Sequence, residues 1–396
     1  MDEVILLRST GESDFFMTLP SLVIKTFDGV AKIPALEWER LADPNFPFSD
    51  YAFLQALEAS GSVGPASGWI PLILTAWAGD CLEGACHLYL KDNSYGEYIF
   101  DWSWAKAYQQ HGEPYYPKLT AAVPFTPATG PKLLFSKAAD RPRVAALLIQ
   151  AAKDLAVRLK CSSLHFLFVT TAELPYLRSA GLTIRDSFQY HWTNAGFASF
   201  ADFLRTLKPK RRKQILRERE QLRSEDLSIR IITGPDLRPE HAVLFHEFYL
   251  STIHKMQATA YLNLEFFVAV FASMPADIVL ILAEHHGAAV AGALYFKKGD
   301  SLFGRYWGAI KDVRNLHFEI CYYQPIEWAI TQNLKRFEAG AQGEHKMARG
   351  LLPELTFSAH WIRHPGFHRA IDGFIKEERT EIKAMFEEMR AHQPFL

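Results

Sequence analysis

The densest group of polar side chains in this 396-residue sequence follows an apolar segment in the last quarter of the chain, in the stretch FEAGAQGEHKMARG. The side chains there that could take part in chemistry are Glu338, Gln342, Glu344, His345, Lys346 and Arg349. A carboxylate or an imidazole can accept a proton from an attacking amine, and two cations can hold a phosphate or a carboxylate. Glycines in the same stretch allow the backbone to approach a ligand closely. We therefore expect a site for attack of an amine on an activated acyl group; a solvated loop with an internal ion pair is the alternative.

Attack of an amine on an acyl ester or thioester needs a held amine, a proton acceptor and hydrogen-bond donors for the developing oxyanion, but no nucleophilic side chain. The catalytic residues that we assign are Glu338, Glu344, His345 and Lys346. Glu344 or His345 would be the base, and Lys346 with Arg349 would hold the anionic part of the donor or the acceptor. The sequence has no GxSxG motif, and Ser103 and Cys321 are expected to be packing residues.

Further substrate-binding candidates lie upstream of this stretch. Arg305, Tyr306 and Trp307 lie on a predicted strand, and His317 begins the next predicted helix, where the N-terminus favours anions. Gln342 and Arg349 complete this group. Core packing is the alternative explanation for the aromatic residues.

A second concentration of aromatic and charged residues lies in the first half of the chain. It includes Asp101, Trp104, Tyr116 and Lys118. One interpretation is an aromatic cleft for a long or flat acceptor. The other is a degenerate scaffold that packs against an active second half.

A basic segment, KRRKQILRERE (210–220), joins the two halves and is predicted to be helical. Lys210, Arg211 and Arg212 could grip the phosphates of RNA or of a nucleotide-linked substrate. The alternative is a solvated helix in which nearby glutamates pair with these cations.

The order of predicted elements recurs in the two halves. Residues 72–105 and 280–309 each read as a strand, a glycine-containing turn, a small-residue strand, a polar turn and an aromatic-rich strand, the last in the first half being EYIFDWSW. A helix and a further strand follow in both halves, and a splayed sheet between the last two strands is where substrates would meet. We predict an α/β protein with mixed α+β sheets, built from two tandem acyltransferase-type (GNAT-like) domains, residues 1–198 and 199–396. Each would be a splayed, mostly antiparallel sheet flanked by helices, and residues 367–390 would form a C-terminal docking helix.

Bulk properties limit the classes of partner. The formal net charge is −1, so no global field attracts nucleic acid or an anionic membrane, and a polyanion would need a local basic patch. The four cysteines form no CxxC pair, which fits reduced thiols. The N-terminus has no signal-like segment, and no apolar run is long enough to span a bilayer, so we expect a cytoplasmic protein.

The sequence also lacks several cofactor motifs. No Q/R-x-x-G-x-G/A loop, which coenzyme A users of this fold present, follows the fourth strand of either half. GxGxxG, Walker and HExxH motifs are absent as well. We expect no metal and no bound cofactor, with an activated acyl donor as co-substrate.

Several long strings resemble the FemAB-like acyltransferases, in the branch described by peptidoglycan biosynthesis or recognition. These strings are FDWSWAKAYQQHG (100–112), YYPKLTAAVPFTPATGPKLL (115–134), GRYWGA (304–309), HFEICYYQPIEWAI (317–330) and FEAGAQGEHKMARGLLPELTFSAHW (337–361). The resemblance implies tandem acyltransferase domains that move an amino acid from aminoacyl-tRNA onto a peptide or lipid-linked amine. It also implies a role for residues 210–220, which look like the basic helix that opens the second domain, and for Glu338 and Gln342 beside the transfer site. GEHKMARG (343–350) departs from the wider group, so that group's catalytic residues do not carry over to this stretch.

We therefore expect an N-acyl or aminoacyl transferase that forms an amide bond on a small-molecule or peptide amine. Its donor would be aminoacyl-tRNA, with tRNA as a partner, or another activated acyl compound. A non-catalytic peptidoglycan or peptide recognition module is one alternative, and a divergent acyl-CoA N-acyltransferase is another. Tests of donor binding and of acceptor binding distinguish the three. The oligomeric state is not encoded in any motif.

Overall fold

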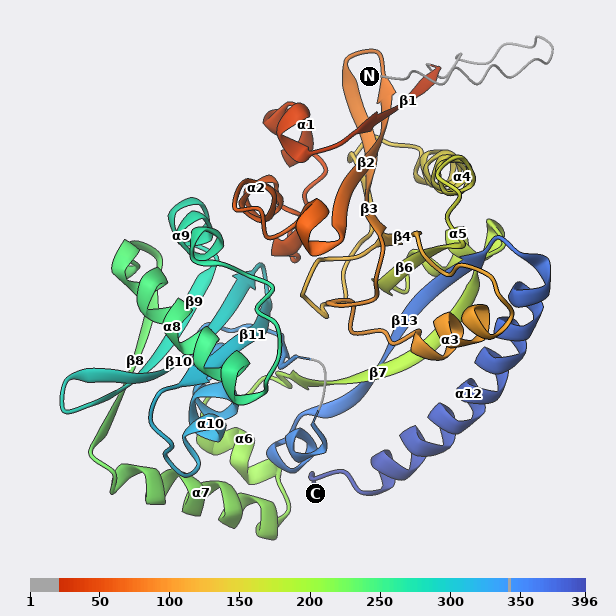
Figure 1. The fold of residues 1–396 in the computed structure, drawn as a ribbon. Helices are drawn as coiled ribbons and strands as arrows, with labels where there is room; N and C mark the ends of the chain where they lie inside the picture. The colour runs from red at the N-terminus through yellow and green to blue at the C-terminus, as the bar shows by residue number, and fades with distance from the viewer. Residues whose placement is uncertain (1–20, 341–342) are drawn as a thin grey trace.

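A single twisted sheet runs through the whole molecule in the computed structural model, which describes residues 21–340 and 343–396 (Figure 1). The strands are β1 (Leu22–Phe27), β2 (Trp69–Ala78), β3 (Cys81–Lys91), β4 (Lys118–Ala121), β5 (Leu133–Phe135), β6 (Ser163–Val169), β7 (Thr183–Thr193), β8 (Leu227–Thr233), β9 (Ile278–His285), β10 (Ala288–Lys298), β11 (Ser301–Ala309), β12 (Arg336–Glu338) and β13 (Leu352–Ile362). Their order is β1-β2-β3-β4-β6-β13-β7-β12-β11-β10-β9-β8, and β5 pairs with β3. Neighbouring strands are antiparallel except for β4 with β6 and β11 with β12, which are parallel.

Strand β13, which comes from the end of the chain, is inserted between two strands of the first half. It pairs antiparallel with β6 through residues such as His360 opposite His165, and with β7 from Leu352 opposite His191 to His360 opposite Thr183. Strand β7 then pairs with β12 of the second half. The halves are therefore interlaced, and the predicted division at residue 198 stays a prediction.

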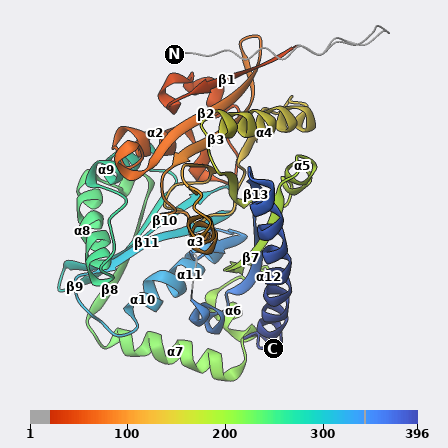
Figure 2. The same ribbon diagram turned by 45° about the vertical axis from the view of Figure 1, so that its right-hand side comes forward.

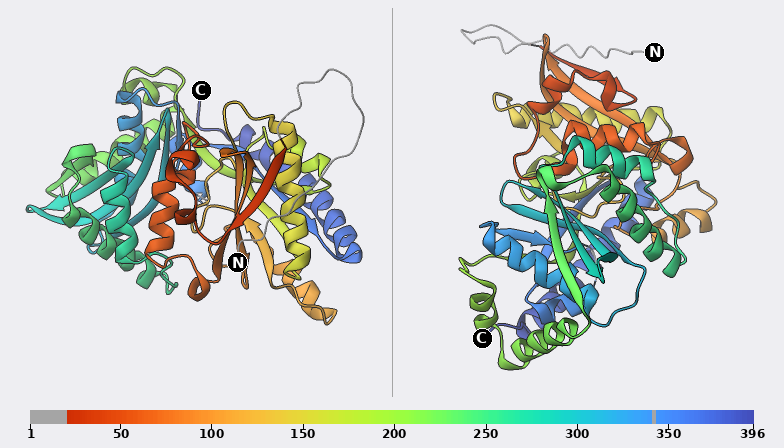
Figure 3. Two further views of the ribbon diagram at one scale, coloured as in Figure 1. Left: turned by 90° about the horizontal axis from the view of Figure 1, so that it is seen from above. Right: turned by 90° about the vertical axis from the view of Figure 1, so that its left-hand side faces the viewer.

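The helices cover both faces of this sheet (Figures 2 and 3). They are α1 (Ala35–Glu39), α2 (Tyr51–Ala59), α3 (Trp102–Gln110), α4 (Arg141–Arg158), α5 (Leu174–Ser179), α6 (Phe200–Thr206), α7 (Pro209–Arg223), α8 (Pro239–Lys255), α9 (Leu264–Ser273), α10 (Leu316–Phe318), α11 (Gln324–Thr331) and α12 (Pro365–Ala391). A π-helical turn, Glu319–Tyr323, joins α10 to α11. Because helices cover both faces, central strands such as β6 and β9 are apolar over most of their length instead of alternating.

An aromatic core joins the two halves. Phe48, which precedes α2, makes edge-to-face contacts with Phe296 of β10 and Phe303 of β11, at ring-centroid distances of 5.2 and 5.3 Å. Phe53 of α2 contacts Phe266 of α9 at 5.8 Å in the same geometry. Each such pair contributes about 0.5–1.5 kcal/mol beyond the burial of its area. Side chains of the first half and of the second half are thus packed into one hydrophobic core.

The mixed α/β fold with a large, mostly antiparallel sheet flanked by helices was predicted correctly. In the second half, β9, β10, β11, the following helix and β12 have the predicted order, and α4, α7 and α12 match predicted helices. The predicted strand EYIFDWSW (97–104) is wrong, because α3 begins at Trp102 and β4 is the strand that pairs with the end of β3. Glu97 and Asp101 instead turn inward to the ammonium of Lys118 on β4.

No helix among the described residues is both long and apolar enough to cross a bilayer. Residues 1–20, for which the sequence predicts no signal segment, lie outside the described residues. The predicted cytoplasmic location stays a prediction.

Candidate functional site

Strands β11 and β12 part after a short parallel contact. Their pairing is limited to Ser301–Phe303 opposite Arg336–Glu338. Strand β11 then continues to Ala309, whereas the segment that follows β12 turns away at Gly340, where φ is +79°. A cavity of about 90 Å³ lies at this point, and its lining includes Gly304 and Trp307 of β11. This is the position at which the strand order predicts an opening between neighbouring parallel strands.

A buried arginine and a buried glutamate face each other at the cavity. Arg305 Nη2 lies 3.9 Å from Glu338 Oε2, and both side chains are at most 2% exposed. The guanidinium lies over the ring of Phe48, 5.1 Å from its centroid, and burial lowers the pKa of Arg305. Among the described residues, Arg305 Nε and Nη2 and Glu338 Oε2 have no hydrogen-bond partner. Since buried polar groups are nearly always hydrogen-bonded, a free donor and a free acceptor here indicate a place where another molecule completes the bonding.

Glu338 is held in place by its other oxygen. Arg336 donates to Glu338 Oε1 at 3.0 Å and also contacts His191 Nδ1 at 2.8 Å. One oxygen of the carboxylate is therefore held by Arg336, while the second has no hydrogen-bond partner among the described residues and lies 3.9 Å from Arg305.

Lys346 supplies a second buried cation near the opening. It follows Gly343 in a short 3-10 helix, Glu344–Arg349, is 3% exposed, and donates from Nζ to the carbonyl of Gly340 at 2.8 Å. Burial, with a smaller contribution from the charge of Arg305, lowers the pKa of Lys346 to about 8. This amine therefore exchanges protons near physiological pH more readily than an ordinary lysine.

The rings of Trp307, His317 and Tyr322 also line the cavity. The ring of His317 lies 4.5 Å from that of Trp307 and 6.1 Å from that of His345. Tyr322 Oη is 2.9 Å from His345 Nε2. Burial and the neighbouring His345 lower the pKa of His317 to about 4, so this ring is neutral at pH 7. Burial and the charge of Arg349 also lower the pKa of His345.

Arg349, a predicted substrate-binding residue, makes internal contacts through all three of its nitrogens. Nη2 bonds to both carboxylate oxygens of Glu218 on α7 at 3.0 Å, Nε donates to Tyr323 Oη at 3.0 Å, and Nη1 donates to the carbonyl of His345 at 2.9 Å. The guanidinium also stacks 3.4 Å from the ring centre of Phe318. These contacts fix the 3-10 helix that carries Lys346, and the predicted role of Arg349 in substrate binding stays a prediction.

The basic helix α7 has one attached face and one exposed face. Glu218 bonds to Arg349, and Arg219 forms ion pairs with Glu319 and Glu327, which attaches the helix to the segment after β11. On the other face Lys210, Lys213 and Arg217 are exposed, and none of the three forms an ion pair with any residue that the structure describes. The predicted residues Arg211 and Arg212 are half-buried, and Arg211 bonds to Gln214 at 3.3 Å.

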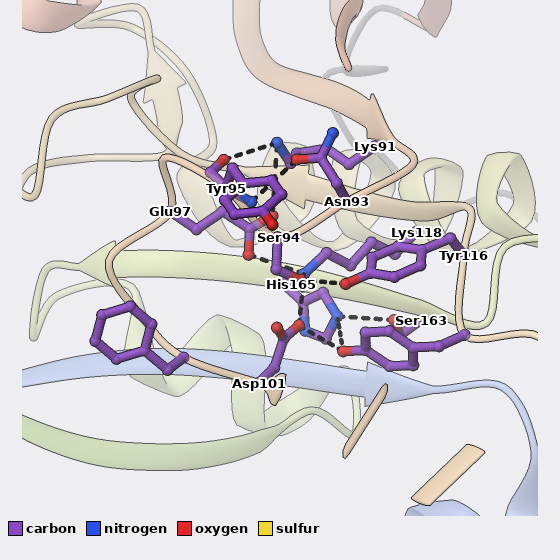
Figure 4. A network of polar contacts seen from close by, with 12 residues as sticks. Lys91, Asn93, Ser94, Tyr95, Glu97, Asp101, Tyr116, Lys118, Ser163 and His165 are labelled. Atoms are coloured by element: carbon purple, nitrogen blue, oxygen red, sulfur yellow. Dashed lines mark hydrogen bonds and ion pairs between the residues drawn. The ribbon is translucent and has the colours of Figure 1, made fainter. Parts of the chain in front are cut away.

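The first-half candidates form a separate buried network (Figure 4). Lys118 is fully buried, and its ammonium donates to Ser94 at 2.7 Å, to Glu97 at 2.8 Å and to Asp101. Although burial opposes the shift, the charge of Lys118 lowers the pKa of Asp101 to about 2, whereas burial raises that of Glu97 to about 7. The hydroxyl of Tyr116 contacts Ser94 at 2.9 Å.

Trp104 closes the same network from the other side. Its ring lies 4.9 Å from that of His360 on β13, and the tryptophan is 3% exposed. The network thus ties α3 and β4 to the inserted strand β13. This sealed arrangement favours the scaffold interpretation of the first half over an open aromatic cleft.

The structure brings together Arg305, Tyr306, Trp307, His317, Glu338, His345 and Lys346 around the opening, and it places Asp101, Trp104, Tyr116 and Lys118 elsewhere. Gln342 and the side chain of Glu344 lie outside the described residues. Glu218 was missed because it looks like a solvated partner of surface cations. Its spacing with Ile215 and Leu222, which are also buried, is the helical pattern that could have identified it.

Comparisons with solved structures show the same fold at low sequence identity. FemX is 11% identical with a TM-score of 0.52, and the match covers 86% of this chain and 98% of FemX. A C-terminal domain from Agrobacterium fabrum, of a protein named as a lysylphosphatidylglycerol synthetase, is 9% identical with a TM-score of 0.54, covering 86% and 96%. L-PGS from Bacillus licheniformis is 9% identical with a TM-score of 0.50, covering 87% and 98%. No curated protein sequence matches the chain.

The family comparison is more specific. The model for the FemAB-like family, described by peptidoglycan biosynthesis/recognition, matches residues 29–396. That match covers nearly the whole chain and includes both Arg305 and Glu338. The chain is therefore a member of the FemAB-like family.

Proposed function

We propose that the protein transfers an acyl or aminoacyl group onto an amine at the opening between β11 and β12. The observation that carries this proposal is the buried pair Arg305 and Glu338, whose free N–H groups and free carboxylate oxygen face each other at 3.9 Å beside a cavity. A donor and an acceptor at this separation suit a reaction in which negative charge develops on one atom while a neighbouring atom loses a proton.

The proposed roles follow from charge and position. Arg305 donates to the carbonyl oxygen of the acyl group and stabilises the oxyanion formed when the amine attacks. Glu338 Oε2 accepts the proton that the attacking nitrogen loses, and that proton then passes to the leaving oxygen or sulfur of the donor. Lys346 adds positive charge near the oxyanion, and Arg349 positions Lys346. The cavity holds about three waters at about 30 Å³ each, which is room for an acyl group of a few heavy atoms.

The donor that we favour is aminoacyl-tRNA. The exposed cations of α7 lie on a helix whose opposite face is attached to the 3-10 helix of Lys346 through Glu218 and Arg349. Phosphates bound on one face would therefore be held a fixed distance from the opening. Membership of the FemAB-like family and a fold shared with a protein named as a lysylphosphatidylglycerol synthetase both support transfer of an aminoacyl group.

The test measures donor binding and transfer separately. Charged tRNA, uncharged tRNA and acyl-CoA are titrated against the purified protein across a salt series. We expect tRNA binding that weakens steeply with salt, and Lys210→Ala with Lys213→Ala should weaken it, because each lost phosphate contact removes released counterions. Lys106→Ala with Lys137→Ala, two exposed lysines of the first half, is the matched control.

Single-turnover transfer to an amine tests the opening itself. Arg305→Met should slow transfer about 100-fold or more, as expected for the loss of an oxyanion donor. Glu338→Gln should slow it by a similar factor and flatten its pH dependence. Arg230→Met, at the far edge of the sheet, should leave the rate unchanged. Normal rates in both opening variants would place the chemistry elsewhere, and acyl-CoA binding without tRNA binding would replace the proposed donor.

A further inference from the structure

Two histidines from distant parts of the chain face each other inside the sheet. His165 of β6 stands opposite His360 of the inserted strand β13, and their Nδ1 atoms are 2.7 Å apart. Both residues are 1% exposed, and neither lines the cavity at the opening between β11 and β12. A buried hydrogen bond between two imidazole rings therefore joins the first half of the chain to its last strand.

The second nitrogen of each ring is bonded as well. His165 Nε2 lies 2.7 Å from the hydroxyl of Ser163, a contact drawn in Figure 4, and His360 Nε2 lies 2.8 Å from the hydroxyl of Ser358. Each serine stands two residues before its histidine, which is the spacing of neighbours on one face of a strand. Because a hydroxyl can donate or accept, each serine suits either neutral tautomer of its ring. All four ring nitrogens of the pair therefore have hydrogen-bond partners.

The contact between the two Nδ1 atoms holds one proton. A hydrogen bond needs one donor and one acceptor, so one neutral ring carries its proton on Nδ1 and the other ring carries it on Nε2. A first additional proton can bind the bare Nε2 of the donating ring, where the serine hydroxyl then accepts. A second additional proton would place two N–H groups against each other at 2.7 Å and break the bond. The bond between the rings thus exists only while the pair carries fewer than two added protons.

Charged and titratable groups of the neighbouring elements face the pair. They are Asp101 and Tyr115 on either side of α3, Lys118 of β4 and Arg185 of β7, with Glu97 and Glu378 as further partners of the two cations. Asp101 stabilises a charge on His165, but Lys118 pairs with the same carboxylate. Arg185, like Lys118, repels an added proton at both rings. Together with burial, these two cations favour the neutral pair.

Folding therefore keeps both rings uncharged. Burial, with the charge of Lys118 next, lowers the pKa of His165 to about 3, and burial, with the neighbouring His165 next, lowers the pKa of His360 well below its ordinary value. An exposed histidine has a pKa of about 6.5, so above that pH neither the closed nor the open pair binds an added proton. As the pH falls below about 6.5, a chain with both rings exposed binds two more protons than the closed pair, and the closed state loses stability.

The two edges of β13 are held to different extents (Figure 1). Toward β7, the strand is paired continuously from Leu352 to His360. Toward β6, it is paired only at Phe357 and from Ala359 to Ile362, and a register shift separates these two parts. The histidine bond lies within the second part. Its loss therefore acts on the shorter of the two pairings that hold the inserted strand.

We propose that His165 and His360 form an acid-sensitive clasp, which holds β13 against β6 while the two rings share one proton and releases that edge when both rings are charged. Strand β13 stays paired with β7, so acid opens one seam of the sheet without removing the strand. The clasp acts independently of the proposed transfer reaction, and either can fail without the other.

Hydrogen exchange measured by mass spectrometry tests the clasp in the wild-type protein. Uptake of two protons raises the opening constant about 100-fold per pH unit, so the protection factors of the amides between β6 and β13 should fall by up to about 100-fold from about pH 5.5 to about pH 4.5. The amides between β9 and β10 are the internal reference, and their protection factors should fall much less. An equal loss of protection in both seams would mean global unfolding in acid and would overturn a local clasp.

Matched variants remove the titration and keep a bond between the strands. In His165→Asn combined with His360→Asn, one side-chain amide can donate to the other, and neither takes up a proton. The loss of protection between β6 and β13 should shrink from about 100-fold to less than about threefold, and His360→Asn alone should show about tenfold. His286→Asn, where the side chain is 70% exposed, should behave as the wild type. A double variant that keeps the wild-type pH dependence would overturn the proposal.

A second measurement does not depend on the folding of any variant. Nitrogen NMR of the wild-type protein with labelled histidines reports which ring nitrogen carries the proton at about pH 7.5. We expect one ring of the pair to be protonated on Nδ1 and the other on Nε2, because only that combination forms the bond. Protonation on Nε2 of both rings would show that no proton is shared and would refute the clasp.

Discussion

Replacement of Lys346 by methionine should separate stability from activity. The ammonium is 3% exposed and lies near the buried Arg305, and its pKa is lowered from 10.5 to about 8. A folded-state pKa below the unfolded value means that the charged form is disfavoured by folding. At about 1.36 kcal/mol per pKa unit, the charge at Lys346 costs about 3 kcal/mol of folding free energy below pH 8.

Lys346→Met removes this cost and also the hydrogen bond to Gly340, which is worth about 1 kcal/mol. We expect the variant to be about 2 kcal/mol more stable than the wild type at pH 7. For a chain of 396 residues this corresponds to a rise in Tm of about 2–3 °C. Transfer should nevertheless fall at least tenfold, because the cation near the oxyanion is lost.

The assay is thermal unfolding of both proteins between pH 6 and pH 10.5. The sign is fixed by linkage: between pH 8 and 10.5 the unfolded chain binds more protons at Lys346, so the wild type gains stability with rising pH relative to the variant. The advantage of Lys346→Met should therefore be constant below about pH 8 and shrink above it. A variant that is less stable at pH 7, or whose difference from wild type does not depend on pH, would refute the assignment of Lys346 as a strained buried cation.

Two further pairs of substitutions test the packing around the site. Arg349→Met should lower the free energy of unfolding by about 3–5 kcal/mol, because it leaves Glu218 buried without its cation, and Glu218→Gln combined with Arg349→Met should recover part of that loss in chemical denaturation. If Arg349→Met alone left stability unchanged but abolished donor binding, Arg349 would be a substrate ligand as the sequence predicts. Gly308→Ala should destabilise the protein by about 1–3 kcal/mol, because the added Cβ meets the backbone carbonyl of Phe248. Gly373→Ala in α12, where no atom lies within 4 Å of the added Cβ, should instead stabilise it by about 0.5–1 kcal/mol. Equal effects at the two glycines in chemical denaturation would contradict the close packing of β11 on α8.

The second half was predicted well because its elements are local and strongly patterned. The apolar run of β9, the small residues of β10 and the aromatic residues of β11 each indicate a strand, and their order implies the parallel partner β12. Once that order is known, Arg305 and Glu338 fall on neighbouring strands. The proximity of the two charges was therefore within reach of the sequence.

The remaining features depend on contacts between distant residues. Residues 97–104 have strand-like composition, but Glu97 and Asp101 are ligands of the Lys118 ammonium, and no local pattern shows that. His360 pairs with His165, and the two residues are 195 positions apart in the sequence. The bond from Arg349 to Glu218 likewise joins two residues that each look like surface charges in the sequence.

The insertion of β13 also constrains how the protein can be made. While the chain grows from its N-terminus, β6 and β7 are complete long before residues 352–362 leave the ribosome, and the slot between them stays empty. Each of these two strands then presents an unpaired edge, which is a template for pairing with other chains. The first half can reach its final sheet only after the last strand arrives, so folding of the two halves must finish together. A chain that ends before Leu352 would keep both open edges and would depend on chaperones to stay out of aggregates.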